Sequence, residues 1–507
     1  SREVGINYII MKAYQTLLFL VSVLLILVGL CFVFPENISI GGLTLRYPTL
    51  EQALRKSNGD RESVEEKLRI AEEELKMQFV RDSILRDSLD RVFAELHADS
   101  LNYIDSLKAY QKMLLNGSVK ISFPNNDISK IFPFFRMLEQ CKKGKDLVRI
   151  LHYGDSQIEA DRISSYIREQ LQQNFGGYGP GMAPAIQPIP SMSVSQFASD
   201  SLPRFIADGT MRQKLSHNRY GVLAQMALLD GRVTLNYSAR NWKKTQPRTK
   251  KFSQVRLIVG KTSNDFSAKL VVDGLQDSVQ YIYDPSEEVS ILKWQLDTTI
   301  SKFKLVLSGK AELYGVAIDG RSGVAVDNVP LRGSSGTFFH RISPSLLSRS
   351  MDALNVRMIL LEFGGNATPY VNSDESVSDY KQMIARQIRY LKSHYPKAQI
   401  LLIGPADMSM KIDGELQTYP FLEEIVNAME EAALENDAYF WNMYQVMGGR
   451  NSMVKWVEHQ PAWAASDYIH FTESGANKIA SFFVQSFMNY YEYYQFLRRN
   501  KEWSGVE

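Results

Sequence analysis

Four side chains in three distant segments of this sequence have the types needed for acyl chemistry through a serine. Ser156 lies in the tetrapeptide GDSQ, Asn366 ends the segment LEFGGN, and Asp467 precedes His470 in DYIH. A neutral histidine can take the proton of a serine hydroxyl, and an aspartate can orient that histidine. An asparagine amide can donate to a developing oxyanion.

Each segment alone has a simpler explanation. Gly-Asp-Ser triplets are mostly turns or helix N-caps, and a loop asparagine commonly bonds its own backbone. An aspartate and a histidine three residues apart also occur together by chance. The combination of all three segments is therefore much more specific than any one of them.

The elements around these segments would bring them to one place. Apolar runs at 146–153 and 356–363 predict strands that end just before Ser156 and Asn366. The carboxyl edge of such a sheet is where α/β proteins bind their ligands. Further strands are predicted at 399–403 and 438–441, and helices at 128–141, 160–175, 376–394, 421–436 and 475–491.

The order of the three segments resembles that of the SGNH or GDSL hydrolase family. The resemblance rests on the first, third and fifth sequence blocks of that family. It implies a three-layer, flavodoxin-like α/β fold with a parallel sheet, and ester hydrolysis or acyl transfer. By this resemblance Ser156 is the nucleophile, His470 the base and Asp467 its orienter. The Asn366 amide and the Ser156 backbone N–H are oxyanion donors.

The family's oxyanion glycine falls in the segment LRGSSGT, residues 331–337. Gly336 best fits the family pattern of a small residue followed by glycine, and Gly333 is the alternative. The chain departs from the family at Gln157, where many members have leucine, and at Ala367, where aspartate is common.

Two residues are candidates for substrate binding. Gln157 lies beside the nucleophile, and Trp242 lies in the basic segment 240–251, which could meet an anionic glycan. A solvated loop is the simpler explanation of that segment.

Residues 200–328 form short strand-like runs separated by turns, which predicts a β-sandwich. It would be inserted into an SGNH domain made of residues 118–199 and 329–507, and it explains the long separation of Ser156 from Asn366. This arrangement resembles the peptidoglycan O-acetylesterases of Gram-negative bacteria, whose insert is similar to a carbohydrate-binding module.

Composition excludes several other classes of protein. The 507 residues allow about three folded units, and a hydrophobic content of 45% is too high for a disordered chain. A net charge of +2 argues against a dedicated nucleic-acid binder. The two cysteines, Cys31 and Cys141, exclude a disulfide scaffold and a cysteine-rich zinc module. The histidines lie in no metal-ligand spacing, so we expect neither a metal nor another cofactor.

An uncharged run at the N-terminus predicts a membrane anchor. Residues 17–34 read LLFLVSVLLILVGLCFVF, and with 13–16 the run reaches the length of about 20 residues that crosses a bilayer. A buried core helix and a cleavable signal peptide are the alternatives. We expect a cytoplasmic tail at 1–12 and a single signal anchor at 13–35, because Arg2 and Lys12 precede the run. The protein would then lie in a bacterial inner membrane with its catalytic domain in the periplasm.

Residues 36–117 predict a spacer that is mostly helical. Val64, Leu68, Ala71 and Leu75 follow a 4-3-4 spacing, which is typical of a coiled coil or a helical hairpin. A coiled coil could make the protein an oligomer, and a helix packed on the body of the protein is an equal alternative.

The sequence therefore predicts a serine esterase that removes O-acyl groups, in particular O-acetyl groups, from a cell-envelope glycan such as peptidoglycan. One alternative is an O-acetyltransferase that works with a membrane-bound O-acyltransferase partner on an envelope polysaccharide. A further alternative is a non-catalytic, anchored glycan-binding or scaffold protein.

Overall fold

The computed structural model describes most of the chain from residue 111 onward. The described residues are 37–40, 43–46, 111–112, 114–117, 119–208, 214–275, 278–281 and 287–499. The expected tail and anchor at 1–35, and most of the expected spacer at 36–117, lie outside these residues. Within the described part, no helix is both long and apolar enough to cross a membrane.

The chain divides into two compact units. One comprises residues 1–63 and 411–416, and the other comprises 64–410 and 417–507. In the first unit β1 (Asn37–Ile40) pairs with β2 (Leu43–Arg46) in antiparallel fashion. The second unit contains all the candidate site residues.

A six-stranded sheet in the order β14-β4-β15-β16-β19-β3 forms the centre of the second unit. Its first five strands are parallel, and only β3 at the edge is antiparallel. The expected parallel sheet is thus confirmed. The strands are β3 (Ile121–Ser122), β4 (Leu147–Gly154), β14 (Gly323–Pro330), β15 (Val356–Glu362), β16 (Gln399–Ile403) and β19 (Tyr439–Trp441).

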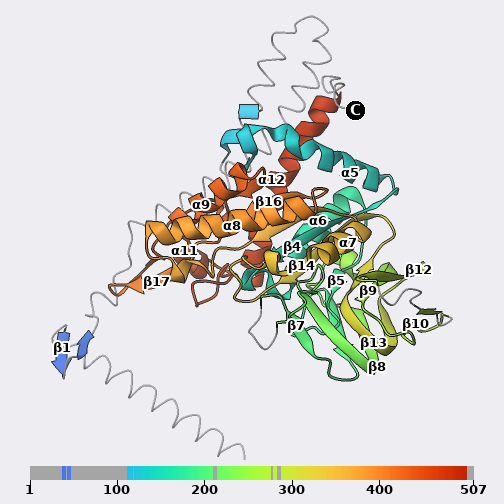
Figure 1. The fold of residues 1–507 in the computed structure, drawn as a ribbon. Coiled ribbons are helices and arrows are strands. Elements are labelled where there is room, and N and C mark those ends of the chain that lie inside the picture. Colours follow the sequence, from blue (N-terminus) through green and yellow to red (C-terminus); the bar gives the residue numbers. More distant parts are fainter. Residues whose placement is uncertain are drawn as a thin grey trace, which may run out of the picture. The chain divides into compact units, whose positions relative to one another are not determined.

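Helices cover both faces of this sheet and make it a three-layer domain. Successive strand residues face opposite layers, so Ile150 packs in one hydrophobic core and Leu151 in the other. The first core contains α5 (Phe132–Lys142), α6 (Ser164–Phe175) and α12 (Glu473–Arg499). The second contains α7 (Pro344–Ala353), α8 (Asp374–His394) and α9 (Leu422–Glu435). Figure 1 shows α8 and α9 side by side beside the sheet.

Shorter elements complete this domain. They are α10 (Met443–Val446), α11 (Ser452–Glu458), and the 3-10 helices η1 (Pro124–Asn126), η2 (Ile128–Ile131), η3 (Ser156–Asp161), η5 (Pro247–Lys250), η6 (Phe339–Arg341) and η7 (Thr368–Tyr370). The strands β17 (Ser409–Ile412) and β18 (Glu415–Thr418) form a separate two-stranded sheet, and its residues 411–416 belong to the first unit.

An antiparallel sheet of nine strands forms the insert, which lies at one side of β4 and β14 in Figure 1. The long strand β13 pairs with β8 and β10 along its first part and with β9 and β5 along its last part, and most of the strands share one core. The strands are β5 (Gly181–Ala183), β6 (Val194–Ala198), β7 (Arg204–Ile206), β8 (Gln225–Ala239), β9 (Phe252–Gly260), β10 (Ser267–Val271), β11 (Ser278–Tyr281), β12 (Ser290–Ile300) and β13 (Lys302–Asp319).

The predicted boundaries of the insert, 200 and 328, need correction at both ends. β5 and β6 precede residue 200 but pair with β13 and β8, so the insert begins near Gly181. β14 precedes residue 329 but pairs with β4 in the central sheet, so the insert ends near Asp319. The first error arose because β5 is very short and lies in a Gly/Pro-rich segment. The second arose because a buried parallel strand is a continuous apolar run, which resembles the neighbouring strands of the insert.

A buried cluster of charged side chains joins the insert to the central sheet. Arg149 of β4 pairs with Asp327 of β14, with Nη1 and Oδ1 2.5 Å apart, and also with Asp319 at the end of β13. Arg256 of β9 donates to the same Asp319 over 3.1 Å. The charges therefore compensate one another across the junction.

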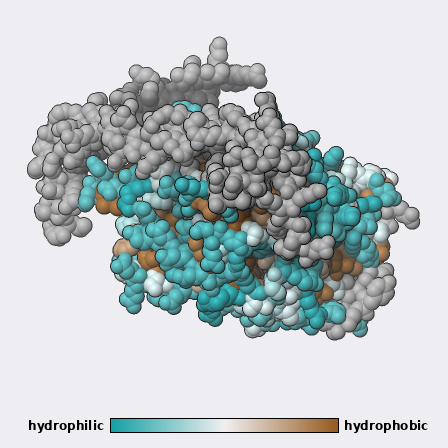
Figure 2. Space-filling model, turned by 90° about the horizontal axis from the view of Figure 1, so that it is seen from above, coloured by the Kyte–Doolittle hydropathy of each residue, from teal (hydrophilic) through white to brown (hydrophobic). Residues whose placement is uncertain are grey.

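The outer faces of the described helices and strands are mainly polar. The view from above in Figure 2 shows a mostly hydrophilic surface with small hydrophobic areas where the structure describes the chain. This is the expected counterpart of helices that bury one apolar face.

Candidate active site

Ser156, Asn366 and His470 meet at the carboxyl ends of β4 and β15. Glu362 at the end of β15 is paired with Gly154 at the end of β4, so the turns that follow these strands are neighbours. Ser156 follows β4 and Asn366 follows β15, and both line one cleft together with His470. The cleft has a volume of about 150 Å³, and its remaining wall is largely apolar, with Phe363, Pro369, Pro405, Met408, Met443 and Ile469.

Ser156, His470 and Asp467 form a continuous chain of hydrogen bonds. Ser156 Oγ lies 2.7 Å from His470 Nε2, and His470 Nδ1 lies 2.7 Å from Asp467 Oδ2. The other carboxylate oxygen of Asp467 accepts the backbone N–H groups of Ile469 and His470, each over 3.0 Å. This geometry lets His470 act as a base toward Ser156 while Asp467 holds its tautomer.

Asp467 is held in its charged form. Partial burial alone would raise the pKa of this carboxyl, but the hydrogen bonds from the His470 backbone and ring and from the Ile469 N–H outweigh it and lower the pKa below its usual value. An ionised Asp467 stabilises the positive charge that His470 acquires when it takes the serine proton.

Gln157 ties the nucleophile's turn to the loop that carries His470. Its amide nitrogen donates to the carbonyl of Ile469 over 2.5 Å, and its amide oxygen accepts the N–H of Phe471 over 3.2 Å. These two backbone groups flank His470 on either side. The structure therefore gives Gln157, a predicted substrate-binding residue, an additional positioning contact, although it also lines the cleft.

Arg162 makes a second link of this kind, which the sequence did not suggest. Its guanidinium donates to the carbonyl oxygens of Ser156, Glu159 and Phe471, over 2.5, 3.0 and 3.0 Å. A sequence pattern could not have identified it, because its partners are backbone atoms and one of them lies in the distant loop after His470.

Asn366 is anchored from two sides. Its amide nitrogen donates to Asp155 Oδ2 over 2.9 Å and to the Ser334 carbonyl over 3.2 Å. Burial raises the pKa of Asp155 to about 7, and nearby Glu362 adds to the rise, while the hydrogen bonds from Gln157 N–H and Asn366 oppose it. Asp155 thus orients the amide within the cleft.

The two candidate oxyanion glycines differ in how their N–H groups are used. The Gly336 N–H donates to Ser334 Oγ over 3.1 Å, and an added Cβ at Gly336 would lie 2.6 Å from the ring of Phe363. Among the described residues, neither the Gly333 N–H nor the Ser156 N–H has a hydrogen-bond partner. A Cβ at Gly333 would meet no atom within 4 Å. Gly333 thus has the free N–H that an oxyanion donor needs, and the assignment of the oxyanion glycine stays a prediction.

The turn of Gly333 is held close to the nucleophile's turn. The Leu331 N–H donates to the Gly154 carbonyl over 2.8 Å, and the Arg332 guanidinium pairs with both carboxylate oxygens of Glu159 over 2.6 Å. Glu159 is three residues after Ser156. Gly333 is thus fixed between a residue bound to the nucleophile's segment and Ser334, which is bound to Asn366.

Trp242 does not line the cleft. It lies on a loop of the insert with 52% of its surface exposed, and the Arg240 guanidinium stacks over its ring at 4.4 Å from the centroid. Lys244 of the same loop pairs with Glu473 at the start of α12 over 2.6 Å. The predicted contact of Trp242 with a glycan stays a prediction.

No group of three or more metal-ligating side chains occurs among the residues that the structure describes.

The chain is similar in structure to a solved peptidoglycan O-acetylesterase. The TM-score is 0.57 with 19% sequence identity, over 73% of this chain and 99% of the other. This likeness concerns the fold alone, and it agrees with the expected arrangement of helices on both faces of a parallel sheet.

Two carbohydrate esterases of family two match with TM-scores that are too low to show a common fold. The one from Cellvibrio japonicus has a TM-score of 0.24 and 9% identity, over 59% of this chain and 99% of its own. The one from Clostridium thermocellum, in complex with cellohexaose, has a TM-score of 0.23 and 11% identity, over 53% and 95%. No protein-family model matches the chain, and no curated protein matches its sequence.

Proposed function

We propose that this protein is a serine esterase that removes O-acetyl groups from a cell-envelope glycan such as peptidoglycan. The observation that carries the proposal is the unbroken chain from Ser156 Oγ through His470 to Asp467, with two contacts of 2.7 Å. The fold shared with a peptidoglycan O-acetylesterase supports the same class of substrate.

The reaction proceeds in two steps through an acyl-serine. Ser156 Oγ attacks the ester carbonyl carbon while His470 Nε2 takes the serine proton. His470 then gives that proton to the sugar oxygen as the ester C–O bond breaks. In the second step His470 takes a proton from water, the hydroxide attacks the acyl-serine, and the proton returns to Ser156 as the acid leaves.

The oxyanion of each step is stabilised by the free N–H groups of Ser156 and Gly333 and by the Asn366 amide. Both N–H groups of that amide donate hydrogen bonds in this structure. Asn366 must therefore give up one of these two hydrogen bonds when it donates to the oxyanion. The contact with the Ser334 carbonyl, at 3.2 Å, is the longer of the two and the one we expect to be released.

The size of the cleft favours a small acyl group. Its volume of about 150 Å³ lies well below the ~300–1,000 Å³ of sites for drug-sized ligands. The apolar wall suits the methyl group of an acetyl ester, whereas a long fatty acyl chain would not be enclosed.

The proposal is tested by replacing the nucleophile. Ser156→Ala should lower the hydrolysis of 4-nitrophenyl acetate and the release of acetate from O-acetylated peptidoglycan by at least about 10³-fold. Ser201→Ala, which alters an exposed serine of the insert, is the matched control and should leave both rates unchanged. Wild-type rates in folded Ser156→Ala would rule the proposal out.

We also propose that residues 13–35 anchor the enzyme in a bacterial inner membrane with the catalytic domain in the periplasm. The uncharged run of residues 17–34 supports this location. Full-length protein should remain in the membrane fraction after washing at high salt, and its catalytic domain should be digested by protease added to spheroplasts. Protection of the domain until the spheroplasts are lysed would contradict the orientation.

A further inference from the structure

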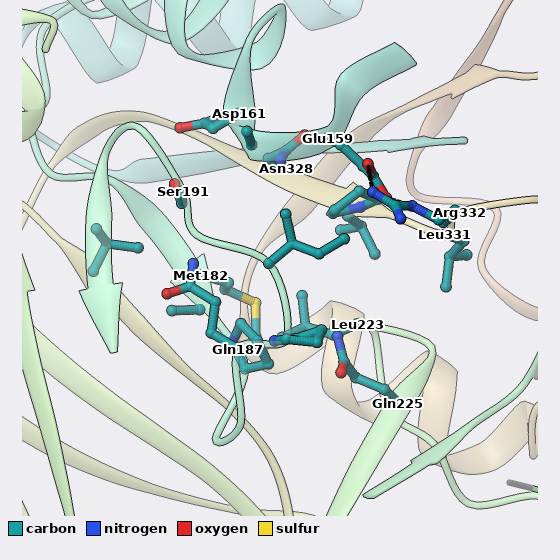
Figure 3. A pocket seen from close by; sticks show the side chains of 18 of the residues that line it. Glu159, Asp161, Met182, Gln187, Ser191, Leu223, Gln225, Asn328, Leu331 and Arg332 are labelled. Carbon is teal, nitrogen blue, oxygen red and sulfur yellow. Dashed lines mark hydrogen bonds and ion pairs between the residues drawn. The ribbon is translucent and has the colours of Figure 1, made fainter. Parts of the chain in front are cut away.

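A second and larger cavity lies between the central domain and the insert. Its volume is about 360 Å³, within the range of small-ligand sites. Figure 3 shows Glu159, Asn328, Leu331 and Arg332 of the central domain on one side, and Met182, Gln187, Leu223 and Gln225 on the other. The cavity thus exists only because the insert is folded against the central sheet.

One wall of this cavity is the segment that carries the nucleophile. Glu159, Ala160 and Asp161 line it, and they directly follow the turn of Ser156. Ala160 and Asp161 have left-handed backbone conformations, with φ of 59° and 67°. Such a strained segment persists only where its surroundings hold it. Here Arg168 holds Asp161 with two contacts of 2.7 and 3.0 Å, so the wall is rigid.

The carboxylates that line the cavity all have cationic or hydroxyl partners. Glu159 pairs with Arg332 over 2.6 Å, and Asp161 pairs with Arg168. Asp208 accepts the hydroxyl of Ser334 over 2.5 Å. These carboxylates therefore need no further cation from a ligand.

Arg204 differs from the other two arginines that line the cavity. Its Nε donates to Gln225 Oε1 over 2.6 Å, and it has no carboxylate partner among the described residues. Burial lowers the pKa of its guanidinium, as expected for a cation that has lost water without gaining an anion. A guanidinium has five N–H donors in a planar fork, and most of the donors of Arg204 remain available to a ligand.

We propose that this cavity binds a carboxylate-bearing sugar unit of the glycan whose ester Ser156 cleaves, with Arg204 as the partner of the carboxylate. This inference rests on the proposed function. A carboxylate matches both the single charge and the planar fork of a guanidinium, because it carries one negative charge and can accept two parallel N–H bonds. One uncompensated cation balances a single negative charge, whereas a phosphate dianion would leave one charge buried without a partner.

The rest of the wall suits a sugar with apolar substituents. Pro180, Met182, Pro184, Leu223 and Val329 contribute an apolar surface, while Ser191 and Asn328 offer polar groups for hydroxyls. The cavity lies beside the nucleophile's turn, so a sugar held there would be part of the same chain as the esterified unit.

The test measures binding rather than catalysis. N-acetylmuramic acid and N-acetylglucosamine are matched probes, because the first differs from the second by a lactyl ether that carries a carboxylate. In the Ser156→Ala background, titration calorimetry should show at least about tenfold tighter binding of N-acetylmuramic acid. Arg204→Gln should abolish this preference, and Arg232→Gln, an exposed arginine of β8 outside the cavity, should preserve it.

A second variant tests whether the sugar occupies the cavity without changing Arg204. Ile189→Trp places a larger side chain at a partly exposed position of the wall and should prevent N-acetylmuramic acid from binding. Both cavity variants should keep the far-UV circular dichroism spectrum and the thermal unfolding midpoint of their Ser156→Ala parent, which shows that they are folded.

Three results would overturn the proposal. They are equal affinity for the two sugars, no binding of either sugar, and an unchanged preference in Arg204→Gln. Each leaves the esterase proposal intact as long as hydrolysis of 4-nitrophenyl acetate requires Ser156. The opposite combination is also informative. If sugar binding depends on Arg204 but hydrolysis does not depend on Ser156, the esterase proposal is refuted. The bound sugar could then not be assigned to the substrate of an esterase.

Discussion

Replacing Gln157 by leucine removes the amide that links the nucleophile's turn to the loop of His470. The Ile469 carbonyl and the buried Phe471 N–H lose their partners at 2.5 and 3.2 Å. A buried polar group without a partner costs about 1–3 kcal/mol, so we expect the loss of the Phe471 contact to lower the free energy of unfolding by about 1–3 kcal/mol. Leucine is similar in size to glutamine, so the change is mainly a loss of hydrogen bonds.

The effect on catalysis follows from the position of His470. The contact of 2.7 Å between Ser156 Oγ and His470 Nε2 requires the two segments to stay in register. A displacement of about 1 Å in a reacting group can cost about 10²-fold in rate. We therefore expect Gln157→Leu to lower kcat for 4-nitrophenyl acetate about 10- to 100-fold, with little change in KM.

Gln172→Leu is the matched control for this experiment. Gln172 is also a buried glutamine with two bonds to backbone carbonyls, those of Gly179 and Val324, over 3.3 and 3.1 Å. It should lower stability, measured by urea unfolding, and leave kcat unchanged. A wild-type kcat in Gln157→Leu, or an equal loss of kcat in both variants, would refute the assigned role of Gln157.

Three further predictions concern the oxyanion site, the pH dependence of stability and the junction of the insert. Asn366→Ala should lower kcat for 4-nitrophenyl acetate by about 10²–10³-fold in folded protein, and a smaller loss would exclude it as an oxyanion donor. Burial raises the pKa of Asp407 to about 6. The unfolded chain thus loses this proton at lower pH than the folded one, and between pH 4 and 7 the wild type should lose about 2 kcal/mol of unfolding free energy relative to Asp407→Asn. Parallel urea curves of the two proteins at both pH values would contradict this. Asp327→Asn leaves Arg149 without one of its two carboxylates and should destabilise the protein by about 3–5 kcal/mol in urea unfolding, whereas a change below about 1 kcal/mol would show that the cluster contributes little.

Much of the central domain could be predicted from local patterns. The strands β4, β15 and β16 are short continuous apolar runs, which indicate buried strands. The helices α8 and α9 have one apolar face, which the helical spacing of their apolar residues reveals. The reacting side chains could be found because each lies in a short segment next to such an element.

The rest depends on contacts between distant segments. The local sequence does not show whether the N–H of Gly333 or that of Gly336 is free to bind an oxyanion. That depends on whether the N–H already has a hydrogen-bond partner, as the Gly336 N–H does in Ser334 Oγ. Arg162 and Gln157 act through backbone atoms of the loop after Asp467, and the sequence does not show which backbone groups come together. β14 was assigned to the insert because only its pairing with β4 reveals the sheet to which it belongs.

The pairing of β5 with the end of β13 bears on how the chain folds. Ile318 lies opposite Gly181, so the two ends of the insert are neighbouring strands. β4 leaves the ribosome long before its parallel partner β14, and closing that long loop costs conformational entropy. An insert that folds first joins its own ends and shortens the effective loop between β4 and β14 roughly sixfold, which lowers the closure cost by about 1.6 kcal/mol. If the insert folds before β14 pairs with β4, it brings the two halves of the interrupted domain together.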